Sequence, residues 1–377
     1  MFDAMESTFH KNKITIANNL ISSFNINYDK RHNVNIVSGN AILADFFSKD
    51  HRESLFIFDS SGINNVMDFY NDISMPADIK VIDIESIKSG KDISRIIHLS
   101  KGIKFIIGVG GGRTADILKF LSFKTDISCI SIPTSLTSHV YASPKIHALP
   151  AIQDFGYKLT IDGKASDLAL VDTSFLEHVY LKNKRLIMAG YGDLMAFWTA
   201  LEDWRLACLN KNNHYNLFAE NVILDIFQKF DDININEKFS KWVDDYILIQ
   251  NQLCHITDWV NSAPASGSEH LFAHEIEKYC DEPMPLHGEL VSIGVLIFGY
   301  IHKLDIEKIV TLLDKFSVSR SLKQIGINKS IVCKALMDSL KYGFKKNRYT
   351  ILNELNFSYA DWENVIDGLI ESNFILE

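Results

Sequence analysis

The strongest constraint on the fold is an alternation of strand-like and helix-like segments over the first 172 residues. Short β-rich runs occur at six places in this part: Asn35–Val37, Leu55–Phe58, Val81–Ile84, Phe105–Val109, Ser128–Ile132 and Leu168–Val171. Segments with helical periodicity, such as Thr114–Phe123, lie between several of these runs. Strands that alternate with helices are typical of a mostly parallel sheet with helices on its faces, so we expect an α/β domain here.

After Asp172 the pattern changes. From Leu176 onward apolar residues recur at intervals of three and four, and strand signals are few. A chain of 377 residues is long enough for two domains. We therefore predict an α/β domain over residues 1–175 and an all-helical domain over residues 176–377. Because no low-complexity linker separates them, we expect the two domains to share a cleft.

Composition excludes several classes of partner. Lys and Arg number 38 against 47 Asp and Glu, a formal charge of −9, which argues against broad binding to nucleic acids or anionic membranes. No apolar run is long enough to span a membrane. The five cysteines are scattered without a CxxC pair, which fits a reducing compartment. The N-terminal residues lack the apolar stretch of a secretory signal, so we expect a cytoplasmic protein.

A glycine run follows the predicted strand Phe105–Val109. Gly110, Gly111 and Gly112 precede Arg113 and a predicted helix. A strand, a glycine run and a helix start expose backbone N–H groups at the positive end of a helix dipole, which suits a pyrophosphate. The run differs from the GxGxxG pattern of dinucleotide sites, and a tight turn would explain it equally well.

Two further segments have residues suited to a nucleotide. Asp59 ends the strand Leu55–Phe58, where a carboxylate would hold an adenosine ribose and favour NAD over NADP, although a turn aspartate is the simpler reading. The loop Ser131–Lys145 is rich in hydroxyl groups, which bind phosphate or ribose but are also common in turns and caps. This loop also contains His139 and Lys145; Lys145 is either a phosphate anchor or simply solvated.

The helical half contains a cluster of candidate metal ligands. Asp193 belongs to a GYGD motif that is expected to open a helix, and His270 and His274 are four residues apart, hence on one helical face. His287 begins the next predicted helix. One carboxylate with two or three imidazoles suits Zn²⁺ and tolerates Fe²⁺, Mn²⁺ or Ni²⁺. Alternatively, Asp193 is only a helix cap and His274 only a buried histidine.

In combination, these motifs resemble one known family. The ordered segments GVGGGRTAD, SIPTSLTSHVYASPK, AGYGDLMAFWTALEDW, SAPASGSEHLFAHEIE and LHGELVSIG resemble those of the sn-glycerol-1-phosphate dehydrogenases. These enzymes belong to the superfamily of iron-containing alcohol dehydrogenases, glycerol dehydrogenases and dehydroquinate synthases. The resemblance runs from about residue 33 to about residue 300.

The resemblance implies a Rossmann-like N-terminal domain, a helical C-terminal domain and an active site in the cleft between them. It implies that Asp193, His270 and His287 bind the metal, whereas His274 contacts the substrate. Together with the residues above, it places the dinucleotide, NAD or NADP, on Asp59, Gly110, Gly111, Gly112, Arg113, Asp116, Thr134, Ser135, Thr137 and Ser143. Substrate contacts are expected from His139, Lys145, Asp193 and His274, with His274 and His139 as candidate proton donors. Family members are commonly dimers or larger, so we expect a homo-oligomer.

One position departs from the family pattern. Relatives usually have an aspartate in a PTxxSxDG loop, where it contacts substrate hydroxyls, and the aligned residue here is His139. An imidazole cannot accept hydrogen bonds as a carboxylate does. The leading hypothesis is hydride transfer between NAD(P)H and the carbonyl of a small polyol or polyol phosphate. The alternatives are a dehydroquinate-synthase-like cyclase that uses NAD catalytically, and a catalytically silent binding protein.

Overall fold

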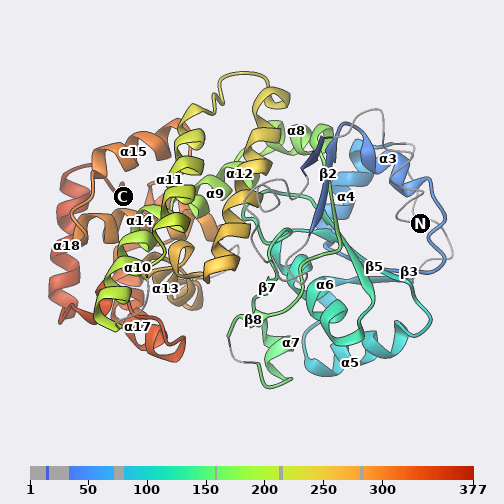
Figure 1. Ribbon diagram of the computed structural model, residues 1–377, viewed down its shortest axis with the longest axis horizontal. Coiled ribbons are helices and arrows are strands. Elements are labelled where there is room, and N and C mark those ends of the chain that lie inside the picture. Colours follow the sequence, from blue (N-terminus) through green and yellow to red (C-terminus); the bar gives the residue numbers. More distant parts are fainter. Residues whose placement is uncertain (1–13, 17–33, 72–79, 158, 212–214, 281–283) are drawn as a thin grey trace. The chain divides into compact units, whose positions relative to one another are not determined.

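The computed structural model describes residues 14–16, 34–71, 80–157, 159–211, 215–280 and 284–377 (Figure 1). The chain forms two compact units. The first comprises Met1–Lys184 and Asn236–His255, and the second comprises Arg185–Ile235 and Ile256–Glu377. The first unit thus extends beyond the expected boundary at residue 175 and takes in a segment of the helical half.

The first unit is built on a seven-stranded sheet in the order β1-β2-β9-β6-β5-β3-β4. All strands are parallel to their neighbours except β1, which is antiparallel to β2. The strands are β1 (Ile14–Ile16), β2 (Asn35–Gly39), β3 (Ser54–Phe58), β4 (Lys80–Asp83), β5 (Phe105–Gly110), β6 (Ser128–Pro133) and β9 (Leu168–Asp172). All six predicted strands are therefore confirmed, and the unit has the expected α/β fold.

Helices of the first unit connect these strands and cover the sheet (Figure 1). They are α3 (Ile42–Phe47), α4 (Ser60–Phe69), α5 (Gly90–Leu99), α6 (Gly112–Thr125), α7 (Pro150–Gln153) and α8 (Thr173–Lys182), with the 3₁₀ turn η2 (Ile84–Ser86). A short antiparallel hairpin, β7 (Lys145–Ile146) and β8 (Ile161–Asp162), lies outside the main sheet. Much of helix α12 (Phe239–Val260) also belongs to this unit.

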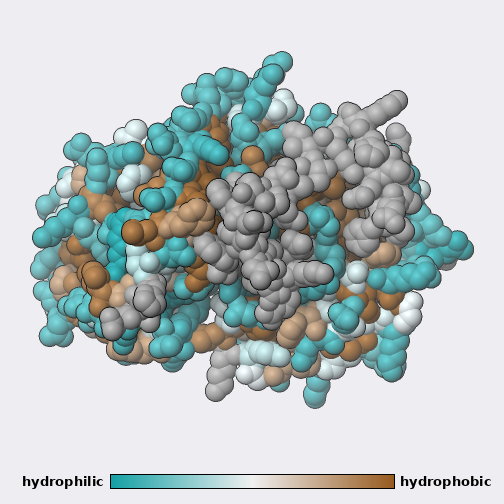
Figure 2. All heavy atoms as spheres, viewed as in Figure 1, coloured by the Kyte–Doolittle hydropathy of each residue, from teal (hydrophilic) through white to brown (hydrophobic). Residues whose placement is uncertain are grey.

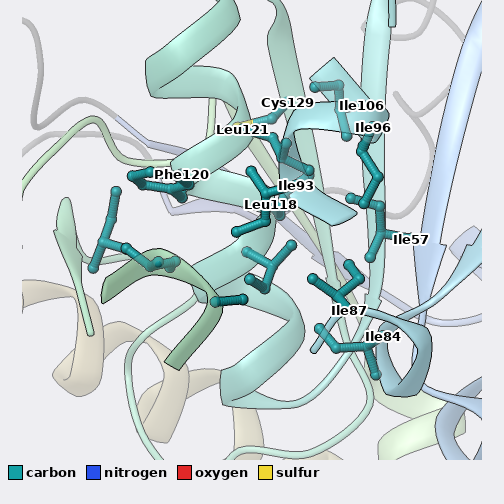
Figure 3. Close-up of a cluster of buried hydrophobic side chains, with 14 of the residues drawn as sticks. Ile57, Ile84, Ile87, Ile93, Ile96, Ile106, Leu118, Phe120, Leu121 and Cys129 are labelled. Carbon is teal, nitrogen blue, oxygen red and sulfur yellow. The ribbon is translucent and has the colours of Figure 1, made fainter. Parts of the chain in front are cut away.

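Branched aliphatic side chains fill the space between the sheet and helices α5 and α6. Figure 3 shows Ile57 of β3 and Ile106 of β5 facing Ile93 of α5 and Leu118 of α6. All four are fully buried or nearly so. Strands covered on both faces read as near-continuous apolar runs, which is why the sequence reveals them clearly. This core fixes the carboxyl ends of β3 and β5, where the nucleotide motifs begin.

The second unit is helical. Apart from one bridge between Ser321 and Leu376, the regular elements among its described residues are helices. They are α9 (Arg185–Leu194), α10 (Phe197–Lys211), α11 (Leu217–Asp232), the end of α12, η3 (Ala263–Ala265), α13 (Ser268–Ile276), η4 (Glu277–Tyr279), α14 (His287–Ile301), α15 (Ile306–Lys315), α16 (Leu322–Ile325), α17 (Lys329–Lys345), η5 (Ile351–Asn353) and α18 (Tyr359–Glu371).

Hydrophilic residues are spread over the described surface in the view of Figure 2, with smaller apolar patches between them. Among the residues described, no helix has both the length and the apolar character that crossing a membrane requires. All five cysteines are free thiols.

Candidate functional site

Two glycines bring Asp193 and His287 together. Helices α9 and α14 approach so closely that a Cβ on Gly192 would lie 2.3 Å from the carbonyl oxygen of Gly288. A Cβ on Gly288 would in turn lie 1.8 Å from the carbonyl oxygen of Ala189. Only glycine permits this crossing. Asp193 follows the first glycine and His287 precedes the second, so the crossing itself places both side chains at one point.

Asp193 lies near the C-terminal end of α9, which runs from Arg185 to Leu194. The expectation that the GYGD motif opens a helix is therefore wrong, and so is the alternative reading of Asp193 as a helix cap. The apolar residues before the motif already belong to the helix. His287 is the first residue of α14, as predicted. A bidentate ion pair between Arg185 and Glu289 joins the starts of these two helices, with both nitrogen–oxygen distances 2.7 Å.

Helix α13 contributes His270 to the same point. Its Nε2 lies 3.3 Å from Oδ1 of Asp193, and Nε2 of His287 lies 3.8 Å from that same oxygen. One donor atom from each of the three residues lies within 4.8 Å of the others. Tetrahedral zinc, with bonds of about 2.0–2.1 Å, places its ligand atoms roughly 3.3 Å apart. The three predicted ligands are thus close enough together to hold one metal ion, and their binding of one stays a prediction.

A carboxylate lies behind each of these imidazoles. Nδ1 of His270 is 2.9 Å from Oε1 of Glu269, and Nδ1 of His287 is 2.7 Å from Oε1 of Glu277. Because these carboxylates accept from Nδ1, each imidazole presents Nε2 to Asp193. Carboxylates in this position fix the tautomer and the orientation of metal-binding histidines. Neither Glu269 nor Glu277 was predicted from the sequence.

Glu269 is itself held firmly. It is completely buried, and it accepts hydrogen bonds from the backbone of Gly267 at 2.6 Å and the hydroxyl of Thr199 at 2.7 Å. Next to it, Asp203 accepts from the backbone of Ser268, the first residue of α13, at 2.7 Å. These contacts fix the start of α13 against α10 and so determine where His270 points.

The cluster attracts positive charge. Burial alone would lower the pKa of His270, but its contacts with Asp193 and Glu269 outweigh burial and raise the pKa to about 9. Burial would likewise raise the pKa of Glu269, yet the partners of this carboxylate hold the pKa below its ordinary value. A divalent cation would take the place of the proton on His270.

His274 lies one helical turn after His270, with its ring centroid 5.3 Å from that of His287. Burial, followed by the charge of Lys346, holds the pKa of His274 well below its ordinary value, so the imidazole is neutral at pH 7. Glu277 lies beside it, with Oε2 3.6 Å from Nδ1 of His274. Donor atoms of His274, Glu277 and His287 form a second group that lies within 4.8 Å. A neutral imidazole beside a metal site can contact substrate or relay a proton.

The first unit contains a pocket at the carboxyl ends of β5 and β6. Gly111 is the N-cap of α6 and supplies no side-chain acceptor for the N–H groups of the first helical turn. These groups remain available to an anion. The pocket is lined by Gly110, Gly111, Gly112, Ala115, Ser131, Pro133, Ser135, Thr137, Ser138, Val140 and Tyr141. It thus brings together the predicted glycine run and part of the hydroxyl-rich loop.

Asp59 lies beside this glycine run. A Cβ on Gly110 would lie 3.1 Å from Cβ of Asp59 and 2.3 Å from the hydroxyl of Thr114, so only glycine fits there. Asp59 also caps α4, accepting from the backbone N–H of Ser61 at 2.9 Å. The carboxylate therefore has the turn role considered as its alternative and also lies beside the glycine run; its contact with a ribose stays a prediction.

A buried lysine that was not predicted from the sequence supports the loop. Lys119 of α6 is completely buried, and its ammonium group donates to the carbonyls of Val140 at 3.0 Å, Ser143 at 3.1 Å and Lys145 at 2.5 Å. Oδ1 of Asp116 lies 3.6 Å from this ammonium and accepts from the backbone of His147. Lys119 and Asp116 thus anchor the segment that follows Thr137.

Several predicted nucleotide and substrate residues have other contacts. Arg113 forms a partly exposed ion pair with Glu85, at 2.9 Å, and the ammonium of Lys145 is paired with Asp162. Asp116 is buried beneath the loop rather than in the pocket wall. Thr134 and Ser143 are also buried. The Thr134 hydroxyl packs against Gly62, where an added Cβ would lie 2.9 Å from it. The Ser143 hydroxyl accepts a hydrogen bond from the backbone N–H of Lys145.

His139 occupies the loop position where the family pattern has aspartate. Its side chain is half-buried. Its carbonyl accepts from the backbone of Ala142 at 2.9 Å and of Ser143 at 3.2 Å, which closes a tight turn. His139 immediately precedes Val140, which lines the pocket.

The sequence is similar to proteins of established families. Residues 41–179 match the iron-containing alcohol dehydrogenase family. A glycerol-1-phosphate dehydrogenase [NAD(P)+] of Sulfolobus acidocaldarius is 31% identical over 336 residues, covering 88% of this chain and 87% of the relative. One of the same name from Metallosphaera sedula is 29% identical over 317 residues, covering 82% and 86%.

The fold has solved counterparts. A probable glycerol dehydrogenase from Sinorhizobium meliloti superposes with a TM-score of 0.67 over 91% of this chain and 98% of that structure, at 15% identity. At this identity the likeness concerns the fold alone. The sequence match with the Sulfolobus protein is closer and extends over most of both chains. The chain therefore belongs to the glycerol-1-phosphate dehydrogenase family of iron-containing alcohol dehydrogenases.

Proposed function

We propose that this protein is a metal-dependent, NAD(P)-linked dehydrogenase that acts on the carbonyl of dihydroxyacetone phosphate or a related small ketone. The observation that carries the proposal is the convergence of Asp193, His270 and His287, with carboxylates behind both imidazoles. Family membership adds the reaction class, because the named relatives are NAD(P)-linked dehydrogenases of glycerol 1-phosphate.

The three ligands leave room for substrate. Three protein ligands on a tetrahedral ion leave one position open, as catalytic sites require. When bound, the divalent ion polarises the substrate carbonyl and the reduced nicotinamide supplies the hydride. Glu269 and Glu277 keep the Nε2 atoms of their histidines directed at Asp193, so that the site is formed before substrate arrives. Zn²⁺ suits this donor set, and Fe²⁺, Mn²⁺ or Ni²⁺ are compatible with it.

The dinucleotide is proposed to bind where Gly110–Gly112 meet the start of α6. The N–H groups of that helical turn would hold the pyrophosphate, and Ser135 and Thr137 would contact phosphate or ribose oxygens. Asp59 would accept from the adenosine ribose and favour NAD. Lys119 and Asp116 would act indirectly, by fixing the backbone of the loop.

Proton transfer is assigned to histidine. The neutral imidazole of His274 can accept a proton on one ring nitrogen and release one from the other. This suits delivery of a proton to the oxygen of the reduced carbonyl. His139 is the second candidate. At this position the relatives have an aspartate, whose carboxylate would accept a hydrogen bond from a substrate hydroxyl. The N–H of His139 would instead donate a hydrogen bond to that hydroxyl.

The test is an assay of metal-loaded protein with NADH and either dihydroxyacetone phosphate or dihydroxyacetone. We expect reduction of the phosphorylated ketone with one NADH consumed per product, and loss of activity after chelation. Product formation without net NADH consumption would instead indicate the cyclase reaction. Full activity in chelator would exclude the metal mechanism.

His270→Ala separates the two sites. We expect the variant to lose bound metal and activity but to retain NADH binding, because the pyrophosphate site lies on a different unit. Metal content measured by elemental analysis and NADH affinity measured by fluorescence check this. A variant that binds metal as the natural protein does would remove His270 from the ligand set.

Three related expectations stay predictions: that the protein works in the cytoplasm, that it forms homo-oligomers, and that it binds small molecules but neither nucleic acids nor membranes. Light scattering of the purified protein tests the second.

A further inference from the structure

Helix α12 supplies two buried polar side chains to the loop of the nucleotide pocket. Tyr246 and Gln250 are four residues apart, so they lie on one face of the helix. Both side chains are completely buried. The part of α12 that contains them belongs to the first unit, as do the residues of the pocket. A buried phenol and a buried amide are unfavourable unless their polar atoms have hydrogen-bond partners.

The partners form a continuous chain of hydrogen bonds between two points of the loop. The hydroxyl of Tyr141 donates to Oε1 of Gln250 at 2.9 Å, and Nε2 of Gln250 donates to the Tyr246 oxygen at 2.9 Å. The hydroxyl of Tyr246 in turn donates to the carbonyl oxygen of Leu136 at 3.2 Å. The chain therefore leaves the loop at Tyr141 and returns to it at Leu136.

The last acceptor fixes the direction of the whole chain. A backbone carbonyl can only accept, so Tyr246 donates its one proton to Leu136 and accepts from the amide N–H of Gln250. The amide oxygen of Gln250 then accepts from Tyr141. Burial raises the pKa of Tyr141, so its phenol keeps the proton that this arrangement needs. Hydrogen bonds linked in one direction strengthen one another.

The two contact points flank the part of the loop that lines the pocket. Thr137 and Ser138 follow Leu136 directly, and Val140 precedes Tyr141. Thr137, Ser138, Val140 and Tyr141 all line the pocket. Helix α12 therefore holds this stretch of the pocket wall at both of its ends.

From these contacts we propose that Tyr246 and Gln250 are positioning residues for the dinucleotide, which keep the loop in the conformation that presents Thr137 to it. The proposal rests on the proposed function, which puts the dinucleotide in this pocket. Neither Tyr246 nor Gln250 lines the pocket, so both act through Leu136 and Tyr141. A loop that is held before the cofactor arrives loses little conformational freedom on binding, which favours affinity.

The test compares Tyr246→Phe with Asp244→Ala in the full chain. Tyr246→Phe removes one hydroxyl and with it two of the three hydrogen bonds. Asp244 lies on the same helix but accepts from Ser38 of β2, at 2.7 Å, so it is a matched control away from the loop. We expect Tyr246→Phe to bind NADH about three- to tenfold more weakly, as the loss of a hydrogen bond predicts.

Stability and affinity separate the two variants. Asp244→Ala should unfold at a lower temperature than the natural protein and yet bind NADH equally well. Zinc affinity should be unchanged in both variants, because the metal ligands belong to the second unit. Equal NADH affinity in Tyr246→Phe and the natural protein would overturn the proposal. Equal losses of NADH affinity in Tyr246→Phe and Asp244→Ala would overturn it as well, since they would follow from destabilisation alone.

A third variant tests whether the hydrogen bonds act as one chain. Tyr141→Phe keeps the ring in the pocket wall and removes the hydroxyl at the other end. Because both hydroxyls act through Gln250, the double variant with Tyr246→Phe should lose less NADH affinity than the product of the two single losses. Losses that multiply would show two independent contacts and would contradict the linked chain.

Hydrogen exchange examines the loop without any cofactor. The backbone N–H groups of Ala142 and Ser143 donate to the carbonyl of His139, so their exchange reports on the loop turn. In the cofactor-free protein we expect both to exchange faster in Tyr246→Phe and at the natural rate in Asp244→Ala. Unchanged exchange in Tyr246→Phe would overturn the positioning role. If the natural protein binds no NADH, the proposed function fails, whereas exchange still decides whether α12 holds the loop.

Discussion

Each metal-directed histidine depends on one carboxylate. Glu269 and Glu277 accept from the Nδ1 atoms of His270 and His287 and so leave Nε2 for the metal in our proposal. Such outer carboxylates typically change metal affinity by about 10–100-fold when they are removed. Their contribution can therefore be measured without altering a ligand.

Glu269→Gln tests this point. We expect zinc affinity, measured by competition with a chelator, to fall about 10–100-fold because the amide no longer accepts as strongly from His270. Glu275→Gln on the same helix is the control, since Glu275 is paired with Lys278 instead. Equal zinc affinity in Glu269→Gln and the natural protein would mean that Glu269 only supports the fold.

Asp59 determines the choice of dinucleotide in our proposal. Asp59→Asn keeps an oxygen that can cap α4 at Ser61 but removes the charge. We expect NADH to bind about tenfold more weakly and the preference for NADH over NADPH to diminish, because the repulsion of a 2′-phosphate is lost. Asp83→Asn, which removes a similar capping carboxylate at the end of β4, should leave the preference unchanged. Fluorescence titration with both cofactors is the measurement.

Residue patterns predicted the potential ligands but not their supports. Asp193, His270 and His287 occur in motifs whose order and spacing are specific. Glu269 is the immediate sequence neighbour of His270, yet only the folded chain shows that its oxygen faces Nδ1. Lys346 lies outside the segments that resemble the family, and its relation to His274 depends on how α17 packs against α13.

At the scale of elements, α6 organises the nucleotide pocket. Its first turn presents N–H groups, and Lys119, two turns further on, holds three carbonyls of the following loop. A single ammonium thus connects the helix to the loop that contains His139 and Ser143. The backbone of this loop therefore depends on one buried ammonium group.

Lys119→Met should therefore weaken both stability and nucleotide binding. Removing one partner of a buried ion pair costs roughly 3–5 kcal/mol, and here it also leaves Asp116 buried without its cation. Urea unfolding and NADH titration measure the two effects. Lys124→Met is the control on the same helix, because that ammonium is exposed and lies over aromatic rings. A Lys119→Met protein as stable as the control would contradict the anchoring role.

The success of the strand predictions follows from burial for five of the six parallel strands, whereas β4, an edge strand without a buried residue, was predicted from its adjacent Val81 and Ile82. The six parallel strands are apolar runs flanked by turns, and all of them were predicted. The missed strands β1, β7 and β8 have only two or three residues, too few for a periodic signal. Asp193 was placed at a helix start because glycines next to a carboxylate resemble a cap, whereas here Gly192 permits the crossing of α9 with α14.

At the scale of the whole molecule, metal loading should depend on pH. His270 in the metal-free protein has its pKa raised from 6.5 to about 9. The charge on His270 therefore contributes stability that is fully present below pH 6.5 and is lost as the pH rises through about 9. Zinc competes with this proton, so zinc affinity should rise about tenfold per pH unit up to about pH 9.

Unfolding temperatures with and without zinc between pH 6 and 9 check the prediction. The metal-free protein should become less stable as the pH rises, while the increment due to zinc should grow. His270→Ala should show neither trend. A zinc increment that is constant over this range would contradict the exchange of a proton for the metal.

Helix α12 has a consequence for how the protein is made. The segment Asn236–His255 completes the first unit. Within it, Asp244 accepts a hydrogen bond from the Ser38 hydroxyl at 2.7 Å, and Gln250 accepts one from the Tyr141 hydroxyl at 2.9 Å. A ribosome that has released only the first 184 residues has released every strand of the sheet but not this helix. The nascent chain must therefore wait through the synthesis of some seventy further residues, between Lys184 and His255, before Tyr141 and Ser38 find their partners.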